Sequence, residues 1–242
     1  MISRIHRLRW LLPALVMSLT AGCGSSDNAK GSSNSLVLDP TQSHYGHTAD
    51  EWGTLWFKYI FELAQTDAKN CIIPYSDPNG ANCTYGQSGD VFFFAGTQGG
   101  AVVRDQCVVP AGKAILVPIV NAEGDNVGVA PQSDMALMTY VKSQLDGVTD
   151  MSFNIDGTAL SNLSSYLTQA TKFTYTEPME PNFYTCNAVT GITGPVSPAY
   201  AAGYYVLLKP PTVGAHTLHF AANSPKSMPA FMVDVTYKFK VQ

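Results

Sequence analysis

The sequence predicts a mainly β protein: an antiparallel β-sandwich, jelly-roll or immunoglobulin-like, with one or two amphipathic helices packed on it. Three observations lead to this fold class. Eight short segments have strand-like patterns, Gly- and Pro-rich turns separate them, and few segments have a helical pattern. The clearest strand is Phe231–Val241, in which apolar residues at every second position share one face.

Composition excludes several classes of protein. Only 13% of the 242 residues are charged, against about 25% in a typical soluble domain, and the formal net charge is −4. These values exclude a chain that is disordered overall, a coiled coil and a basic nucleic-acid-binding protein. We therefore expect no nucleic-acid partner.

The N-terminal segment has the pattern of a signal peptide. Arg4, Arg7 and Arg9 precede an apolar run, and no acidic residue occurs there. Residues 10–22 would span about 20 Å as a helix, which is too short for a bilayer core of about 30 Å. Residues 1–22 are therefore expected to be a signal peptide rather than a membrane span.

Small residues stand directly before Cys23. The segment Leu19-Thr20-Ala21-Gly22-Cys23 resembles the lipobox of bacterial lipoproteins, although Thr20 stands where that family usually has Leu. The resemblance implies cleavage before Cys23, a lipid on Cys23, and an outer-membrane location if the host has one, because Gly24 follows. The membrane would then be a partner through the N-terminal lipid. An ordinary signal peptide with a chance cysteine is the alternative.

Behind Cys23, the sequence divides into a tether and one domain. Gly24–Ser35 contains no apolar residue larger than Ala, so it cannot bury enough surface to offset its ordering entropy. Residues 23–37 are expected to be a lipidated flexible tether. Residues 38–242 show no internal linker and are expected to form a single domain.

Two segments have clear helical patterns. Thr48 and Glu51 have capping-box spacing, and a stripe at the helical period follows them, formed by Trp52, Leu55, Trp56, Tyr59, Ile60 and Leu63. A second helix is predicted from Ser133 to Leu145, with Gly147 beyond its end. A short helix or turn is expected over Ala159–Leu167.

The remaining regular segments are predicted strands: Val91–Ala95, Ala101–Val109, Lys113–Val120, Met151–Ile155, Lys172–Thr176, Tyr204–Leu208, His216–Phe220 and Phe231–Val241. The turn Gly96–Gly100 predicts that the first two form a hairpin. Residues 177–202 lack a regular pattern, so we expect a long connection of the kind that is often functional in a compact domain.

Four cysteines remain once Cys23 is set aside. An even number in an oxidising compartment indicates two disulfides, for which three pairings are possible. We favour Cys83–Cys107, which flank the predicted hairpin, together with Cys71–Cys186. Buried free thiols are the alternative. No pair has CxxC spacing, so zinc or thioredoxin-like chemistry has little support.

Several segments together form a recognisable pattern: His47–Phe57, Cys83–Phe93, Ala95–Thr97, Arg104–Lys113, Pro118–Glu123 and Gly214–Phe220. They resemble a family of uncharacterised bacterial secreted proteins, and they are spread over most of the mature chain. The resemblance implies an extracytoplasmic, single-domain, β-rich protein. It implies no activity and no catalytic residue.

Oxygen-bearing side chains gather in Asn121-Ala122-Glu123-Gly124-Asp125-Asn126, at the end of an apolar strand. Calcium prefers such ligands, but the spacing is not that of an EF-hand, and a solvated turn is the alternative. Glu123 and Asp125 are candidate binding residues. Arg104 is a third, because an Arg–carboxylate pair with Asp105 or Asp90 could hold a ligand carboxylate or phosphate; such a pair is more often structural or surface-exposed.

The histidines give weak signals. His44 and His47, with Asp50, could hold zinc or copper, but we favour the alternative that they form a polar helix entrance. His216 and His219 have an odd separation on a strand, so they face opposite sides and cannot share one ion without a bulge.

Aromatic residues offer two candidate surfaces. Trp52 and Trp56 could stack on a sugar, but their helical spacing indicates core packing first. Tyr184 and Tyr200 fall in the predicted loop, where aromatic side chains supply rigid contact area, so both are candidate binding residues.

No catalytic signature is present: the chain has no GxSxG nucleophile elbow, no P-loop and no HExxH motif. We therefore predict no catalytic residue, metal or cofactor. The leading hypothesis is a lipid-anchored envelope protein that acts as a binding or structural module for a glycan, a partner protein or an envelope component. The alternative is a secreted hydrolase or metal-dependent enzyme that uses Glu123 and Asp125 with His44 and His47.

Overall fold

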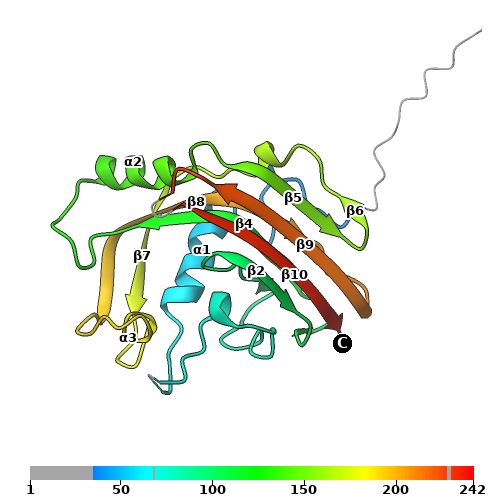
Figure 1. The fold of residues 1–242 in the computed structure, drawn as a ribbon, viewed down its shortest axis with the longest axis horizontal. Helices are drawn as coiled ribbons and strands as arrows, with labels where there is room; N and C mark the ends of the chain where they lie inside the picture. Colours follow the sequence, from blue (N-terminus) through cyan, green and yellow to red (C-terminus); the bar gives the residue numbers. More distant parts are fainter. Residues whose placement is uncertain (1–34, 68, 228–229) are drawn as a thin grey trace, which may run out of the picture. The chain divides into compact units, whose positions relative to one another are not determined.

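Two β-sheets form the framework of the computed structural model, which describes residues 35–67, 69–227 and 230–242 (Figure 1). The predicted signal peptide, Cys23 and nearly all of the tether lie outside the described residues. The first sheet has the order β1-β4-β8-β7, and the second has the order β2-β10-β9-β5-β6, with β3 also paired to β10.

The strands of the first sheet are β1 (Val91–Phe93), β4 (Ala114–Gly124), β8 (Gly194–Leu208) and β7 (Thr171–Glu177). Those of the second are β2 (Gly100–Arg104), β3 (Val108–Val109), β5 (Thr149–Ile155), β6 (Thr158–Ala159), β9 (Gly214–Ser224) and β10 (Phe231–Val241).

The mainly β prediction is confirmed, but the strictly antiparallel one is wrong. β1 runs parallel to β4, and β10 runs parallel to both β2 and β3. Both sheets are therefore mixed, because the chain enters each of them by a crossover rather than by a hairpin. The jelly-roll and immunoglobulin-like types stay predictions.

Local capping fixes the two main helices. α1 (Ala49–Phe61) begins after Thr48, whose side chain and that of Glu51 make both bonds of a capping box. α2 (Asp134–Leu145) begins after Ser133, whose hydroxyl accepts a bond from the Ala136 N–H. Both predicted helices are confirmed. The short elements are α3 (Phe183–Cys186), η1 (Pro74–Ser76) and η2 (Leu163–Tyr166).

Apolar packing places the first sheet between α1 and the second sheet. One core contains inward-facing residues of both sheets together with the buried side of α2. A second core lies on the other face of the first sheet, under Trp52, Trp56 and Phe57 of α1. Gly53 allows this close approach, because a Cβ atom there would lie 2.9 Å from the Tyr205 ring of β8.

The predicted hairpin between residues 91–95 and 101–109 is wrong. β1 belongs to the first sheet and β2 to the second, so the Gly-rich segment 96–99 passes between sheets instead of turning back. Side chains replace the missing ladder bonds there: the Tyr237 hydroxyl bonds Ala95, and Arg104 donates to the carbonyls of Ala95 and Gly96. No pattern local to the segment encodes these partners.

The expected irregular connection over residues 177–202 is too long. β8 begins at Gly194, and its residues 199–208 are all buried. A strand covered on both faces has no apolar–polar alternation, so residues 199–203, which are small except for Tyr200, gave no strand pattern. Tyr200 therefore lies on a strand and not on a loop, with 5% of its surface exposed.

Both favoured disulfides are confirmed. Cys83 pairs with Cys107, and Cys71 pairs with Cys186, 115 residues further along the chain. The first bond joins the loop before β1 to the segment between β2 and β3. The pairing was predicted correctly, although the hairpin that these cysteines were expected to flank does not form. Disulfides are typical of oxidising compartments, so the structure is compatible with an extracytoplasmic protein. Among the described residues, no helix has the length and apolarity needed to cross a membrane.

Candidate functional site

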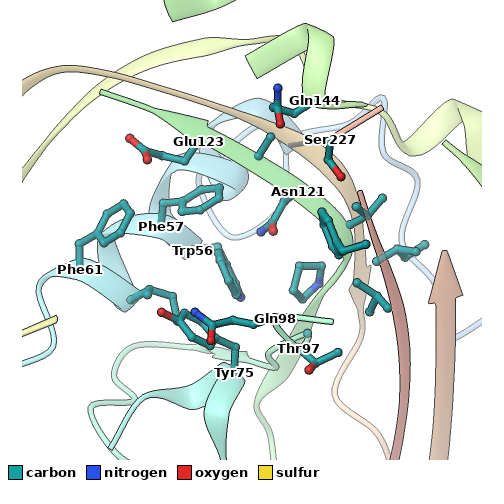
Figure 2. Close-up of a pocket in the computed structure, with 18 of the residues that line it drawn as sticks. Trp56, Phe57, Phe61, Tyr75, Thr97, Gln98, Asn121, Glu123, Gln144 and Ser227 are labelled. Carbon is teal, nitrogen blue, oxygen red and sulfur yellow. The ribbon is translucent and has the colours of Figure 1, made fainter. Parts of the chain in front are cut away.

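A cavity of about 530 Å³ lies where α1, α2 and the first sheet meet the segment 96–98 (Figure 2). Its volume falls within the usual range for small-molecule pockets, about 300–1,000 Å³. The residues that line it are Trp56, Phe57, Ile60, Phe61, Tyr75, Gly96, Thr97, Gln98, Pro118, Ile119, Val120, Asn121, Ala122, Glu123, Tyr140, Gln144, Phe183, Ser227, Phe231 and Val233.

The early end of β1 opens this space. β1 pairs only with residues 114–116 of β4, whereas β8 pairs with β4 as far as Gly124. From Pro118 to Glu123, β4 therefore has a strand on one side and, among the described residues, none on the other. Pro118 has no N–H to offer a neighbour, and the register with β8 shifts between Pro118 and Val120. Both features suit an open strand edge.

Aromatic rings form one wall of the cavity. Trp56, Phe57 and Phe61 come from α1, and Phe183 comes from α3. The Trp56 Nε1–H donates to the carbonyl of Phe94 at 2.7 Å, so its polar atom is satisfied and the rest of the ring contributes apolar surface. Core packing and a ligand platform are not alternatives for Trp56, because one ring both packs in the core and lines the cavity.

Glu123 lies at one end of the cavity, near Phe57 and Phe61, and Gln98 and Thr97 lie toward the other end (Figure 2). Its Oε1 atom is buried and accepts no hydrogen bond from any described residue. Burial, with a smaller contribution from Asp125, raises the pKa of Glu123 well above the usual carboxyl value. The Glu123 side chain as a whole is half-buried. A buried carboxyl oxygen without a partner is still costly, and a ligand that supplied a donor or a positive charge would offset that cost.

Asp125 lies near Glu123, but both of its carboxylate oxygens already accept hydrogen bonds. Its Oδ2 accepts from the hydroxyls of Tyr175 at 2.5 Å and Tyr184 at 3.2 Å, and its Oδ1 accepts from the Val127 N–H at 2.7 Å. The two tyrosine hydroxyls also bond each other at 2.6 Å. The predicted neighbours Glu123 and Asp125 therefore lie close together, and only Glu123 lines the cavity.

Phe61 connects the aromatic wall to this tyrosine pair. Its ring stacks on Tyr175 with centroids 4.5 Å apart and lies 6.4 Å from Tyr184. Burial is the main cause that raises the pKa of both tyrosines, so both are neutral and can donate. Tyr184, predicted as an exposed contact residue, instead holds the acidic strand end in place.

Glu177, at the end of β7, is a second buried acid that sequence reasoning missed. Neither carboxyl oxygen has a hydrogen-bond partner among the described residues. Burial raises its pKa to about 7, although the backbone N–H groups of Phe183 and Tyr184, which lie near it without meeting hydrogen-bond geometry, favour its charged form. Alternation along β7 places it on the buried face with Phe173 and Tyr175, which is the signal that could have found it.

Arg104 is structural and is not available to a ligand. It is 1% exposed, and its guanidinium donates to the carbonyls of Tyr75, Asp77, Ala95 and Gly96 and to the Tyr237 hydroxyl. The predicted pairing with Asp105 or Asp90 is wrong, because the chain between β1 and β2 crosses between sheets. Arg104 instead fixes the backbone on both sides of Gly96, and so positions the cavity wall that carries Tyr75 and Gln98.

Polar side chains complete the lining. The Asn121 amide donates to the Tyr205 hydroxyl at 3.0 Å, while its carbonyl oxygen accepts no bond from the described residues. Gly203 makes room for this contact, since a Cβ atom there would lie 2.5 Å from the Asn121 Cβ. None of the described residues that line the cavity is Lys, Arg or His. Glu123 is thus the one carboxyl group in the described lining.

The remaining predicted residues lie elsewhere. His44 and His47 line hollows other than the Glu123 cavity, so the structure does not assemble the expected histidine–carboxylate site. His216 and His219 contact different carboxylates, those of Asp156 and Asp234, as expected for opposite faces of a strand. No group of three or more metal-ligating side chains occurs among the described residues.

Several cavity residues gave no signal in the sequence. Tyr75 and Gln98 sit in irregular segments, and Phe183 sits on a four-residue helix that no periodicity could show. The crossover after β1 carries Gln98, and the Cys71–Cys186 bond ties the chain before Tyr75 to the helix that carries Phe183.

No protein-family model and no curated protein matches the chain. Two solved structures give low similarity. A chain in the structure of PbICP-C in complex with falcipain-2 has a TM-score of 0.24 and 13% identity, covering 64% of this chain and 100% of that one. The solution structure of Amebosin has a TM-score of 0.19 and 10% identity, covering 59% and 96%. Scores this low carry no argument about fold or function.

Proposed function

We propose that this protein is a lipid-anchored, extracytoplasmic binding module, built on a two-sheet sandwich, whose ligand occupies the Glu123 cavity. The observation that carries the binding function is a pocket of small-molecule size that combines an aromatic wall with one buried, unpartnered carboxyl oxygen. The lipobox-like segment before Cys23 and the two disulfides support the location.

A fragment screen by ligand-observed NMR tests the binding function. Fragments of positive, neutral and negative charge are compared on the wild type and on Gln98→Trp, which places an indole in the cavity from an exposed loop position. Gln169→Trp, at another exposed position outside the cavity lining, is the matched control. We expect fragments to bind the wild type and the control alike, and Gln98→Trp to weaken them by about tenfold, the scale of one lost apolar contact patch.

Two outcomes of that screen contradict the proposal. Fragments that bind Gln98→Trp as well as the wild type would place the binding site elsewhere. A library from which nothing binds the wild type would remove the small-molecule function altogether.

Mass spectrometry of the protein extracted from its own cells tests the location. We expect an N-terminus at Cys23 with a mass increase that corresponds to attached acyl chains, and a Cys23→Ala variant that is no longer membrane-associated. An unmodified N-terminus with reduced cysteines would contradict both the anchor and the oxidising compartment.

One observation favours a hydrolase as the second candidate. Glu123 has a raised pKa beside a second carboxylate, which is the condition of a general acid. Against it, Asp125 is held by three hydrogen bonds and does not line the cavity. Chromogenic glycosides and esters test it: turnover by the wild type that Glu123→Gln abolishes would support hydrolysis.

A further inference from the structure

The charge and shape of the cavity also narrow the class of ligand. We propose that the Glu123 cavity binds a small organic cation, a ligand with an ammonium group attached to an apolar or aromatic part. This inference rests on the proposed binding function and goes beyond it by naming the ligand chemistry.

The first argument is the sign of the charge. Glu123 lines the cavity with a buried, unpartnered Oε1, and the described lining contains no cationic side chain that could neutralise it or hold an anion. The nearest buried cation in that part of the fold, Arg104, has all of its donors engaged behind Gly96. A ligand anion would find no counter-charge in this lining, whereas a ligand ammonium would supply a donor to the Oε1 atom and would favour the charged form of Glu123.

The second argument is the surface beside the carboxylate. Phe57 and Phe61 lie at the Glu123 end of the cavity, and Trp56 continues the same wall (Figure 2). Aromatic rings attract cations through their faces as well as packing against apolar groups. An ammonium group at Glu123 with a carbon skeleton along this wall would satisfy both kinds of surface at once.

The third argument is the supply of further acceptors. The side-chain carbonyl oxygen of Asn121 accepts no hydrogen bond from the described residues. The edge of β4 from Pro118 to Glu123 that does not pair with β8 faces no other described strand. A primary ammonium carries three donors, of which Glu123 can accept at least one. The open strand edge and Asn121 offer acceptors for the others.

Calorimetric titration with three matched probes tests the inference: phenethylamine, 2-phenylethanol and phenylacetate, which are cationic, neutral and anionic. We expect phenethylamine to bind the wild type at least about tenfold more tightly than 2-phenylethanol, as charge-assisted hydrogen bonds exceed neutral ones, and phenylacetate to bind weakest. Glu123→Gln should weaken phenethylamine about tenfold and leave 2-phenylethanol within about twofold.

Asp105→Asn is the control for net charge, because it removes one exposed carboxylate outside the cavity lining. It should leave all three affinities unchanged. Glu123→Gln removes a buried charge without changing the side-chain volume, so it should fold at least as well as the wild type, and thermal unfolding confirms this.

Equal affinity for phenethylamine and 2-phenylethanol would overturn the cation inference and leave the binding function standing. Loss of binding of both probes in Glu123→Gln would also overturn it, because the residue would then shape the cavity rather than read charge. Absence of binding of either probe to the wild type would also overturn the cation inference. The fragment screen with Gln98→Trp tests the proposed binding function independently of these probes.

Discussion

At the scale of single residues, buried charge determines much of this structure. Arg104 is a buried cation whose partners are mostly backbone carbonyls, so its bonds hold three chain segments together: the η1 turn, the crossover after β1, and β10 through Tyr237. Removing it would leave several buried acceptors without donors.

Arg104→Met is expected to lower the free energy of unfolding by about 3–5 kcal/mol, the usual cost of breaking a buried charged network. Arg104→Lys should also destabilise the fold, because one ammonium cannot reach the same set of carbonyls. Urea denaturation measures the change in the free energy of unfolding for both variants. Lys238→Met, at an exposed site on β10, is the control, and its change should be close to zero. A fully stable Arg104→Lys variant would contradict this role.

Glu177 gives the fold a dependence on pH. Burial raises its pKa to about 7, above the value of about 4.3 in an unfolded chain. Between these values the folded state binds more protons than the unfolded state, so stability is greatest below the unfolded pKa and falls as the pH rises through 7. Discounted for partial screening by solvent, the loss is about 1–2 kcal/mol.

Glu177→Gln should reduce this loss, so that the variant exceeds the wild type in stability at pH 8 and matches it near pH 5. Urea denaturation across that range measures the slope. Some slope should remain, because Glu123 shifts in the same direction. An unchanged slope in Glu177→Gln would show that its carboxyl is solvated in solution.

At the scale of elements, α1 is the part whose placement matters most to the cavity, because it carries Trp56, Phe57 and Phe61. Gly53 lets it approach β8. In an ordinary helix Gly→Ala stabilises by about 0.5–1 kcal/mol, but here the added Cβ would lie 2.9 Å from the Tyr205 ring.

Gly53→Ala is therefore expected to destabilise the fold by about 1–3 kcal/mol, the range for overpacking a tight contact. It should also weaken fragment binding, since α1 must move away from β8. Thr48→Ala is the comparison variant. Loss of the helix cap should lower the free energy of unfolding by about 1 kcal/mol without moving α1 away from β8. A stabilised Gly53→Ala would show that Tyr205 moves aside freely.

The elements also show what sequence could and could not predict. Thr48 and Ser133 gave correct helix starts because capping acts between neighbours in the chain. The predicted β1–β2 hairpin was wrong because Arg104 and the sequence-distant Tyr237 hold the chain in a crossover between sheets. Glu123 stays a candidate: an acid at a strand end is visible locally, and the structure places it in a cavity lining. Its aromatic surroundings follow from how α1 packs on the first sheet, which periodicity alone does not give.

At the scale of the whole molecule, the two disulfides join segments that are distant in sequence. Cys83–Cys107 closes a loop of 24 residues and Cys71–Cys186 one of 115. The stabilisation by a crosslink grows slowly with loop length. Replacing both Cys83 and Cys107 by Ser should therefore lower the free energy of unfolding by about 3 kcal/mol, and replacing both Cys71 and Cys186 should lower it by about 4–5 kcal/mol. Urea denaturation of both variants measures this order, and equal or reversed losses would contradict it.

The longer crosslink has a consequence for when the protein can work. Cys186 ends the four-residue helix that carries Phe183, and its bond to Cys71 ties that helix to the chain after α1. Without that bond, the helix would be held by the Asn182 side chain, which donates to the carbonyls of Pro178 and Ile192, and by the Tyr184 hydroxyl at Asp125. A newly made polypeptide with its thiols still reduced would keep these contacts but lack the covalent tie to the chain after α1, so oxidation would complete the wall that carries Phe183.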